Sequence, residues 1–187
     1  MVHLTFVRCA DLAEDGCIAL RDAKALFLLA KIVTEKFGKP QLLFSSGNDE
    51  ALASARIFNL VCAARGINEV TALNHQSLGA DCHAFMSFLE REAQSVNAKH
   101  IVLICTHNAF VNFFHVNPVF ANSCTLCADK WDNILADYHS MWFPFQTNSD
   151  ANEPPLPVDI VLNYPCSASD TLLIENTIAE YHRNYVI

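Results

Sequence analysis

Polar side chains follow several strand-like stretches of the chain, at the point where each stretch ends. The first stretch, VHLTFV, ends in Arg8 and Cys9, a cation followed by a potential nucleophile. Imidazole beside a thiol or hydroxyl is suited to nucleophilic catalysis, and arginine binds anions. The later ends supply hydroxyl, amide and imidazole groups, namely Ser45, Ser46, Asn48, Asn74, His75, Thr106, His107 and Asn108.

These ends belong to predicted strands that alternate with predicted helices. Strand-like alternation or buried apolar runs predict strands, and a 3.6-residue apolar period predicts helices. The predicted strands cover 2–8, 41–46, 68–74, 99–107 and 157–165, and the predicted helices 19–38, 50–66, 81–98 and 169–185. We expect Ser169 or Asp170 to cap the closing helix.

Alternation of this kind predicts an α/β protein built as a three-layer sandwich, with a mainly parallel central sheet and helices on both faces. We expect one domain over 1–187, with an insertion or flap at 117–157. Because ligands of such sheets bind beyond the carboxyl ends of the strands, the polar ends should meet in one pocket.

At this point the chain resembles the histidine phosphatase superfamily, to which phosphoglycerate mutases belong. FVRCA resembles the family's Arg-His-Gly motif, FSSGNDEALASA its Ser-Ser-x-x-x-Arg-Ala segment, and VLICTHNAF its strand ending in Ser-His-Gly. The resemblance covers roughly residues 2–115. It implies a histidine-phosphatase-like fold in which a histidine accepts the phosphoryl group, and two arginines and a second histidine hold its oxygens.

Carried over position by position, the resemblance keeps Arg8 and His107 but loses other functional groups. Cys9 stands in place of the nucleophilic histidine, and Glu50 in place of the second arginine. Asn108 replaces a motif glycine, and Asn74 or His75 lies near the expected acid. A carboxylate at the position of an arginine repels a phosphate, since a charge pair at about 4 Å is worth about 4 kcal/mol near a surface. We therefore expect an Arg8–Glu50 ion pair to fill the phosphate site.

Two functions remain open at this stage. The first is a degenerate member, a pseudoenzyme without phosphohydrolase or mutase activity that binds a small anionic ligand or a protein partner. Its site would contain Arg8, Ser45, Glu50, His75 and Asn108. The alternative is an active phosphatase-like or thiol-dependent hydrolase or transferase, with Cys9 as nucleophile and His107 as its base.

Metal binding is a weaker hypothesis. Cys9, Glu50, His75 and His107 are suitable ligand types, but they have no diagnostic spacing. Cys124 and Cys127 form a CxxC, for which His139 and Cys166 are the only plausible completing ligands, and a loop packed by small cysteines is the simpler interpretation. We expect no metal and no cofactor.

Composition excludes several classes of partner. The chain is 52% hydrophobic and 17% charged, with a formal net charge of -8. This charge disfavours nucleic acid, and no apolar run reaches the roughly 18 residues of a membrane span. The eight cysteines lie scattered in apolar segments, as expected for small buried side chains in a reducing compartment. We expect a cytoplasmic protein that binds neither nucleic acid nor membrane, with a homodimer possible.

Overall fold

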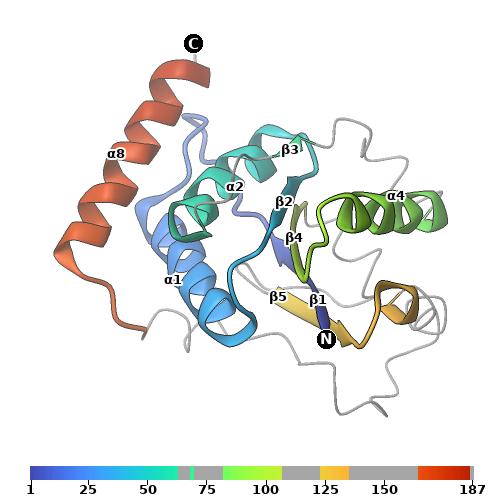
Figure 1. Ribbon diagram of the computed structural model, residues 1–187. Coiled ribbons are helices and arrows are strands. Elements are labelled where there is room, and N and C mark those ends of the chain that lie inside the picture. The colour runs from blue at the N-terminus through green and yellow to red at the C-terminus, as the bar shows by residue number, and fades with distance from the viewer. Residues whose placement is uncertain (63–67, 70–81, 107–122, 135–163, 186–187) are drawn as a thin grey trace.

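The computed structural model describes residues 1–62, 68–69, 82–106, 123–134 and 164–185 (Figure 1). Helices and strands alternate along most of this length, which confirms the predicted α/β class. The elements are β1 (Val2–Arg8), α1 (Leu20–Phe37), β2 (Leu42–Ser45), α2 (Asp49–Cys62), β3 (Asn68–Glu69), α4 (Cys82–Ser95), β4 (His100–Cys105), β5 (Ser123–Ala128) and α8 (Ala168–Tyr185).

The strands form one sheet in the order β3-β2-β4-β1-β5. β3, β2, β4 and β1 pair in parallel, whereas β5 pairs antiparallel with β1. The sheet is therefore mixed. The register places Arg8 opposite Cys105 and Ser45 opposite Ile104, so the carboxyl ends of the three strands lie side by side.

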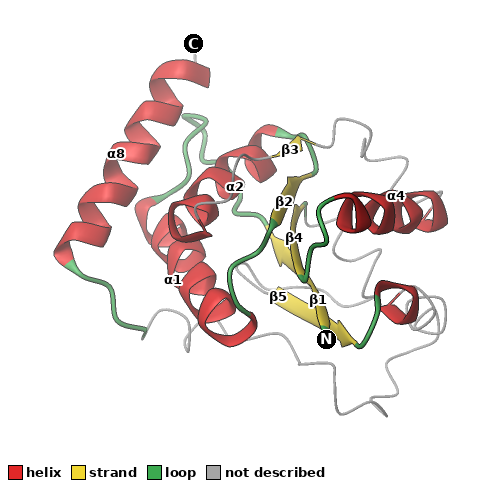
Figure 2. Cartoon of the chain, viewed as in Figure 1, coloured by secondary structure: helices red, strands yellow, loops and turns green. Residues whose placement is uncertain are grey.

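Buried side chains form one apolar cluster on each face of the sheet. Val7, Val102 and Ile104 belong to a cluster shared with α1, α2 and α8. Leu4 and Phe6 point to the opposite face, where α4 contributes to the second cluster. Figure 2 accordingly shows α1, α2 and α8 on one side of the strands and α4 on the other. This alternation is what a strand covered on both faces requires.

Helix α1 illustrates how sequence sets the bounds of an element. Its buried residues run from Ala23 to Val33 and are continuous from Ala25 to Ala30. They belong to the cluster shared with the sheet, α2 and α8, so this helix is buried on more than one side. The helix ends at Gly38, whose φ of 81° lies in the left-handed region that favours glycine. The predicted helix at 19–38 is confirmed to within a residue at each end.

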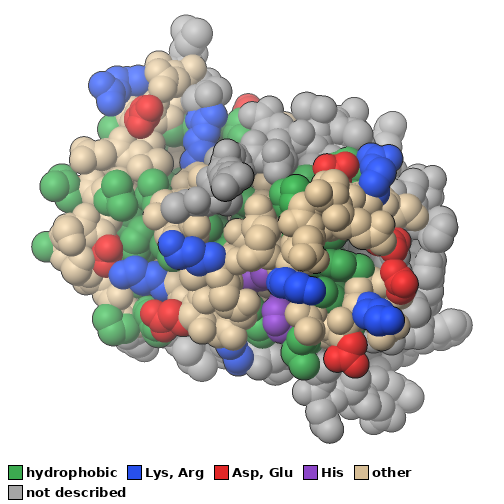
Figure 3. All heavy atoms as spheres, in the orientation of Figure 1, with side chains coloured by type: hydrophobic (Ala, Val, Ile, Leu, Met, Phe, Trp, Pro, Cys, Tyr) green, Lys and Arg blue, Asp and Glu red, His purple; other side chains and the backbone are tan. Residues whose placement is uncertain are grey.

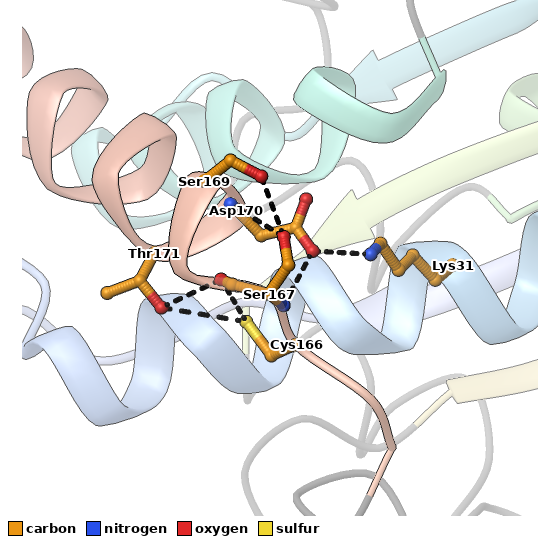
Figure 4. A network of polar contacts seen from close by, with 6 residues as sticks. All are labelled: Lys31, Cys166, Ser167, Ser169, Asp170 and Thr171. Carbon is orange, nitrogen blue, oxygen red and sulfur yellow. Dashed lines mark hydrogen bonds and ion pairs between the residues drawn. The ribbon is translucent and has the colours of Figure 1, made fainter.

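Helix α8 begins at Ala168, one residue before its predicted start, and its cap precedes both predicted caps, Ser169 and Asp170. Ser167 precedes the helix, and its Oγ accepts a hydrogen bond from the Asp170 backbone N–H at 3.1 Å. The Asp170 carboxylate in turn accepts from the Ser167 N–H at 3.0 Å and contacts Lys31 Nζ of α1 at 2.7 Å (Figure 4). Ser167 is thus the cap, and Asp170 completes a reciprocal capping box that is tied to α1.

Strand β5 was not expected from the sequence, which assigned 117–157 to an insertion or flap. Within that range the structure describes 123–134, and residues 123–128 join the sheet as an edge strand. The buried Thr125 hydroxyl lies 2.9 Å from the Thr5 hydroxyl of β1. Residues 157–163 of the predicted strand at 157–165 and most of the predicted strand at 68–74 lie outside the described residues, and residues 164 and 165 are not in a strand. Among the helices that are described, none is long and apolar enough to cross a membrane.

Candidate functional site

The carboxyl ends of β1, β2 and β4 are joined by backbone hydrogen bonds. The Cys9 N–H donates to the Cys105 carbonyl at 2.8 Å, and the Ser46 N–H donates to the Ile104 carbonyl at 3.1 Å. Parallel pairing continues one residue beyond each strand, which holds the polar ends together. The structure therefore brings Arg8, Cys9 and Ser45 to one edge of the sheet, as predicted.

Arg8 forms an ion pair with Asp11, three residues further along the chain. Its Nη2 lies 3.0 and 3.1 Å from the two carboxylate oxygens of Asp11. The Arg8 side chain is 8% exposed and that of Asp11 is 76% exposed. The predicted Arg8–Glu50 ion pair is therefore wrong: between these described residues, Asp11 takes that role. Asp11 lies only three residues after Arg8, so its carboxylate reaches the guanidinium from the same loop.

Cys9 is buried, with 3% of its surface exposed, and belongs to the apolar cluster of α1 and α2. Burial raises the pKa of its thiol to about 12, partly offset by Arg8 and reinforced by Glu50 and Asp11. Near neutral pH only about one thiol in a hundred thousand would then be a thiolate. Cys9 is consequently a neutral, unreactive group in this state.

Glu50 is half-buried in the first turn of α2, next to Asp49. Carboxylates at a helix N-terminus are stabilised by the positive end of the helix dipole. The Glu50 carboxylate lies close enough to Cys9 to raise the pKa of its thiol. Glu50 thus has a structural reason to stand here, and it makes the edge of the sheet more negative.

The β2–α2 loop satisfies much of its own hydrogen bonding. The buried Ser45 Oγ accepts from the Gly47 N–H at 3.4 Å, and Ser46 Oγ donates to Asn48 Oδ1 at 3.1 Å. Gly47 has a φ of 80°, which few side chains tolerate. These contacts describe a loop of fixed shape, with the Ser45 hydroxyl turned inward.

Sequence reasoning missed two residues of this edge. Ser54 of α2 is fully buried, and its Oγ accepts from the Ala10 N–H at 2.9 Å, which ties the loop after β1 to α2. Asp22 lies near Arg8 and Asp11: burial raises its pKa, Arg21 and Arg8 lower it, and Asp11 raises it. The sequence offers one signal for Ser54, a serine within the alanine-rich segment ALASA. Which side chain a loop contacts depends on tertiary packing, so neighbouring residues do not indicate it.

Several predicted site residues lie outside the described residues. These are His75, His107 and Asn108, together with Asn74, the alternative to His75. The pairing of Cys9 with His107 thus stays a prediction.

No group of metal-ligating side chains occurs among the described residues. In β5, position 124 pairs with Phe6 and position 127 with His3. Positions three apart in a strand belong to opposite faces of the sheet, so this CxxC is not arranged to chelate one ion.

Comparisons with known proteins assign no family to this chain. No protein-family model matches the chain, and no curated protein matches it in sequence. A crystal structure of a phosphoserine phosphatase variant from Entamoeba histolytica, in complex with phosphoserine, is similar with a TM-score of 0.42 and 11% identity. The match covers 68% of this chain and 91% of that one. Similarity at this level carries no argument about the site or its chemistry.

Proposed function

We propose that this chain is a degenerate histidine-phosphatase-like domain with a three-layer α/β architecture. It has lost phosphohydrolase and mutase activity and acts by binding a ligand or a protein partner. The observation that carries the proposal is the state of Cys9: the position that matches the family nucleophile holds a thiol that is buried and protonated.

The charge around Arg8 supports the same proposal. The guanidinium that matches the family's phosphate clamp is engaged by Asp11. Glu50 and Asp22 add negative charge at the same edge. Glu50 raises the pKa of Cys9, and the pKa of Asp22 responds to both Arg8 and Asp11. A phosphate dianion would have to displace Asp11 and then lie near other carboxylates, which Coulomb repulsion opposes. The ligand or partner site we propose therefore does not depend on a bound phosphate.

The thiol-dependent alternative is disfavoured by the same geometry. A catalytic thiol needs a lowered pKa or an adjacent base, as well as access for the substrate. The Cys9 thiol has a raised pKa, and the apolar cluster that it shares with α1 and α2 covers it and denies a substrate access. Cys105, its nearest counterpart on β4, is buried as well, and burial raises its thiol pKa well above the ordinary value.

The test is phosphate release by the purified protein from p-nitrophenyl phosphate and from a panel of phosphorylated metabolites that includes phosphoserine. We expect release at the rate of a buffer blank, with no difference between the wild type and His107→Ala. Turnover that His107→Ala abolishes would overturn the proposal. Turnover that instead disappears in Cys9→Ser would favour the thiol-dependent alternative.

Binding of inorganic phosphate, measured by calorimetry, provides an independent check. We expect no saturable binding at millimolar concentrations by the wild type. Saturable binding that Arg8→Gln removes would mean that the phosphate clamp is still in use.

A further inference from the structure

A second cysteine lies far from Cys9 in the sheet and has a histidine within hydrogen-bonding distance. Cys127 of β5 is opposite His3 of β1 in the antiparallel register. The Nδ1 atom of His3 lies 3.2 Å from Cys127 Sγ. Both side chains are half-buried, so both still reach solvent. This pair lies near the amino end of β1, at the opposite edge of the sheet from Arg8 and Cys9.

The ring of His3 is held in place by its neighbours. The Phe37 ring lies 5.2 Å from it, centroid to centroid, and the His100 ring meets it edge-on at 6.0 Å. Burial lowers the pKa of His3, and the positive charge of the N-terminus lowers it further. A neutral imidazole with Nε2 protonated leaves Nδ1 free to accept the thiol proton.

His100 is already committed to structural hydrogen bonds. Its Nδ1–H donates to the Gly38 carbonyl at 2.7 Å. Its Nε2 therefore accepts from the Thr5 hydroxyl at 2.9 Å, and Thr5 accepts from Thr125 at 2.9 Å. This chain of hydrogen bonds fixes β1, β4, β5 and the end of α1 around the pair. His100 thus supports the pair, and His3 is the histidine that lies within hydrogen-bonding distance of Cys127.

Exposed lysines lie on the segments that contact His3 and His100, in a chain that is acidic overall. Lys99 accepts a hydrogen bond from the His3 N–H through its carbonyl at 2.8 Å, and its side chain is exposed. Lys36 Nζ lies 5.8 Å from the Phe37 ring centroid, and exposed Lys39 follows Gly38. On the face drawn in Figure 3, histidine side chains reach the surface between Lys or Arg side chains. Such surroundings favour an anion approaching the thiol.

We propose that Cys127 is a modification site, a nucleophilic thiol with His3 as its base, that forms a mixed disulfide with a small anionic disulfide. The Cys127 proton moves to Nδ1 of His3, and Sγ attacks one sulfur of the incoming disulfide. The S–S bond of that disulfide breaks, and the departing thiolate takes up the proton. Cys127 is oxidised and half of the disulfide is reduced, so no further oxidant is needed.

The experiment compares thiols within one protein. The folded wild type is exposed to oxidised glutathione near neutral pH, quenched at intervals, and each cysteine is followed by peptide mass mapping. Cys166, which is exposed, and Cys17, which is half-buried, serve as internal controls. We expect Cys127 to be modified faster than either control, and oxidised glutathione to react faster than the cationic disulfide cystamine at Cys127 alone.

The role of His3 is tested with His3→Gln, whose folding is checked by its thermal transition. We expect the Cys127 rate to fall at least about tenfold, as expected for loss of a general base, with Cys166 unchanged. The proposal is overturned if Cys166 reacts at least as fast as Cys127 in the wild type, or if folded His3→Gln reacts at the wild-type rate. If this variant does not fold, the comparisons in the wild type decide the matter: preference for cystamine at Cys127 would also overturn it.

Discussion

The Arg8 guanidinium is held by the Asp11 carboxylate at 3.0 Å, inside the loop that follows β1. This ion pair places the negative partner of Arg8 on its own loop and leaves Glu50 to act on Cys9 from the start of α2. Because Asp11 is largely exposed, the pair contributes little to stability. Its main effect is on what can bind at the edge of the sheet.

Replacing Asp11 with Asn should therefore change anion binding more than folding. We expect Asp11→Asn combined with Glu50→Gln to bind inorganic phosphate measurably in calorimetry, because Arg8 loses one competitor and the site loses a repulsive charge. The thermal transition should shift by the equivalent of less than about 1 kcal/mol. Glu14→Gln, an exposed loop acid nearby in sequence, is the matched control and should not bind. If the double variant does not bind phosphate, the charges of Asp11 and Glu50 are not what prevents phosphate binding in the wild type.

The buried thiols should make the protein sensitive to alkali. The pKa of Cys9 is raised to about 12 and that of Cys62 to about 11, in both cases mainly by burial. Above pH 9 the unfolded chain loses these protons while the folded chain keeps them, so stability falls as pH rises. Relative to pH 8, each thiol should lower the free energy of unfolding at pH 10 by about 1 kcal/mol.

Urea unfolding at the two pH values measures this loss. Cys62→Ala should lower stability at pH 8 and reduce its further loss at pH 10, whereas Cys166→Ala, at an exposed position, should do neither. An equal pH dependence in Cys62→Ala and the wild type would contradict the assignment.

His100 should make the protein sensitive to acid. Burial lowers its pKa from 6.5 to about 4, although the Gly38 carbonyl opposes the shift. As pH falls below 6.5 the unfolded histidine takes up a proton that the folded one does not, so stability is lost between pH 6.5 and 4. At pH 5 the lowered pKa of His100 should reduce the free energy of unfolding by about 2 kcal/mol.

Unfolding at pH 7 and pH 5 gives the measurement. His100→Gln should be less stable at pH 7, because the hydrogen bonds to Gly38 and Thr5 are altered, and should lose less on acidification. Exposed His182 provides the control, since His182→Gln should follow the wild type. If His100→Gln and the wild type lose the same stability between these pH values, another group is responsible.

The capping box of α8 should be measurable by substitution. Ser167→Ala removes the acceptor for the Asp170 N–H and should cost about 1 kcal/mol. Ser169→Ala removes a hydroxyl that lies 2.8 Å from the Ser167 hydroxyl (Figure 4) but does not bond a backbone group of the box, and it should cost less. Thermal denaturation followed by circular dichroism compares the two. Equal losses would mean that the box does not hold the helix start.

Much of the fold follows from the sequence because periodicity is a local property. The apolar spacing of α1 and α2, and the buried runs of β1 and β4, each specify their element without reference to distant residues. β5 escaped this reasoning for a physical reason. Its sequence SCTLCA carries hydroxyls on one face, which reads as polar loop until Thr5 is known to lie opposite Thr125.

The site divides in the same way. The sequence by itself determined that Arg8, Cys9 and Ser45 lie at the ends of strands and that a carboxylate opens α2. Only the tertiary structure decided that Arg8 pairs with Asp11, that the core covers the Cys9 thiol, and that His3 meets Cys127. Secondary structure depends on residues within a few positions, whereas partners and burial depend on which segments pack together, and that is settled by the whole chain.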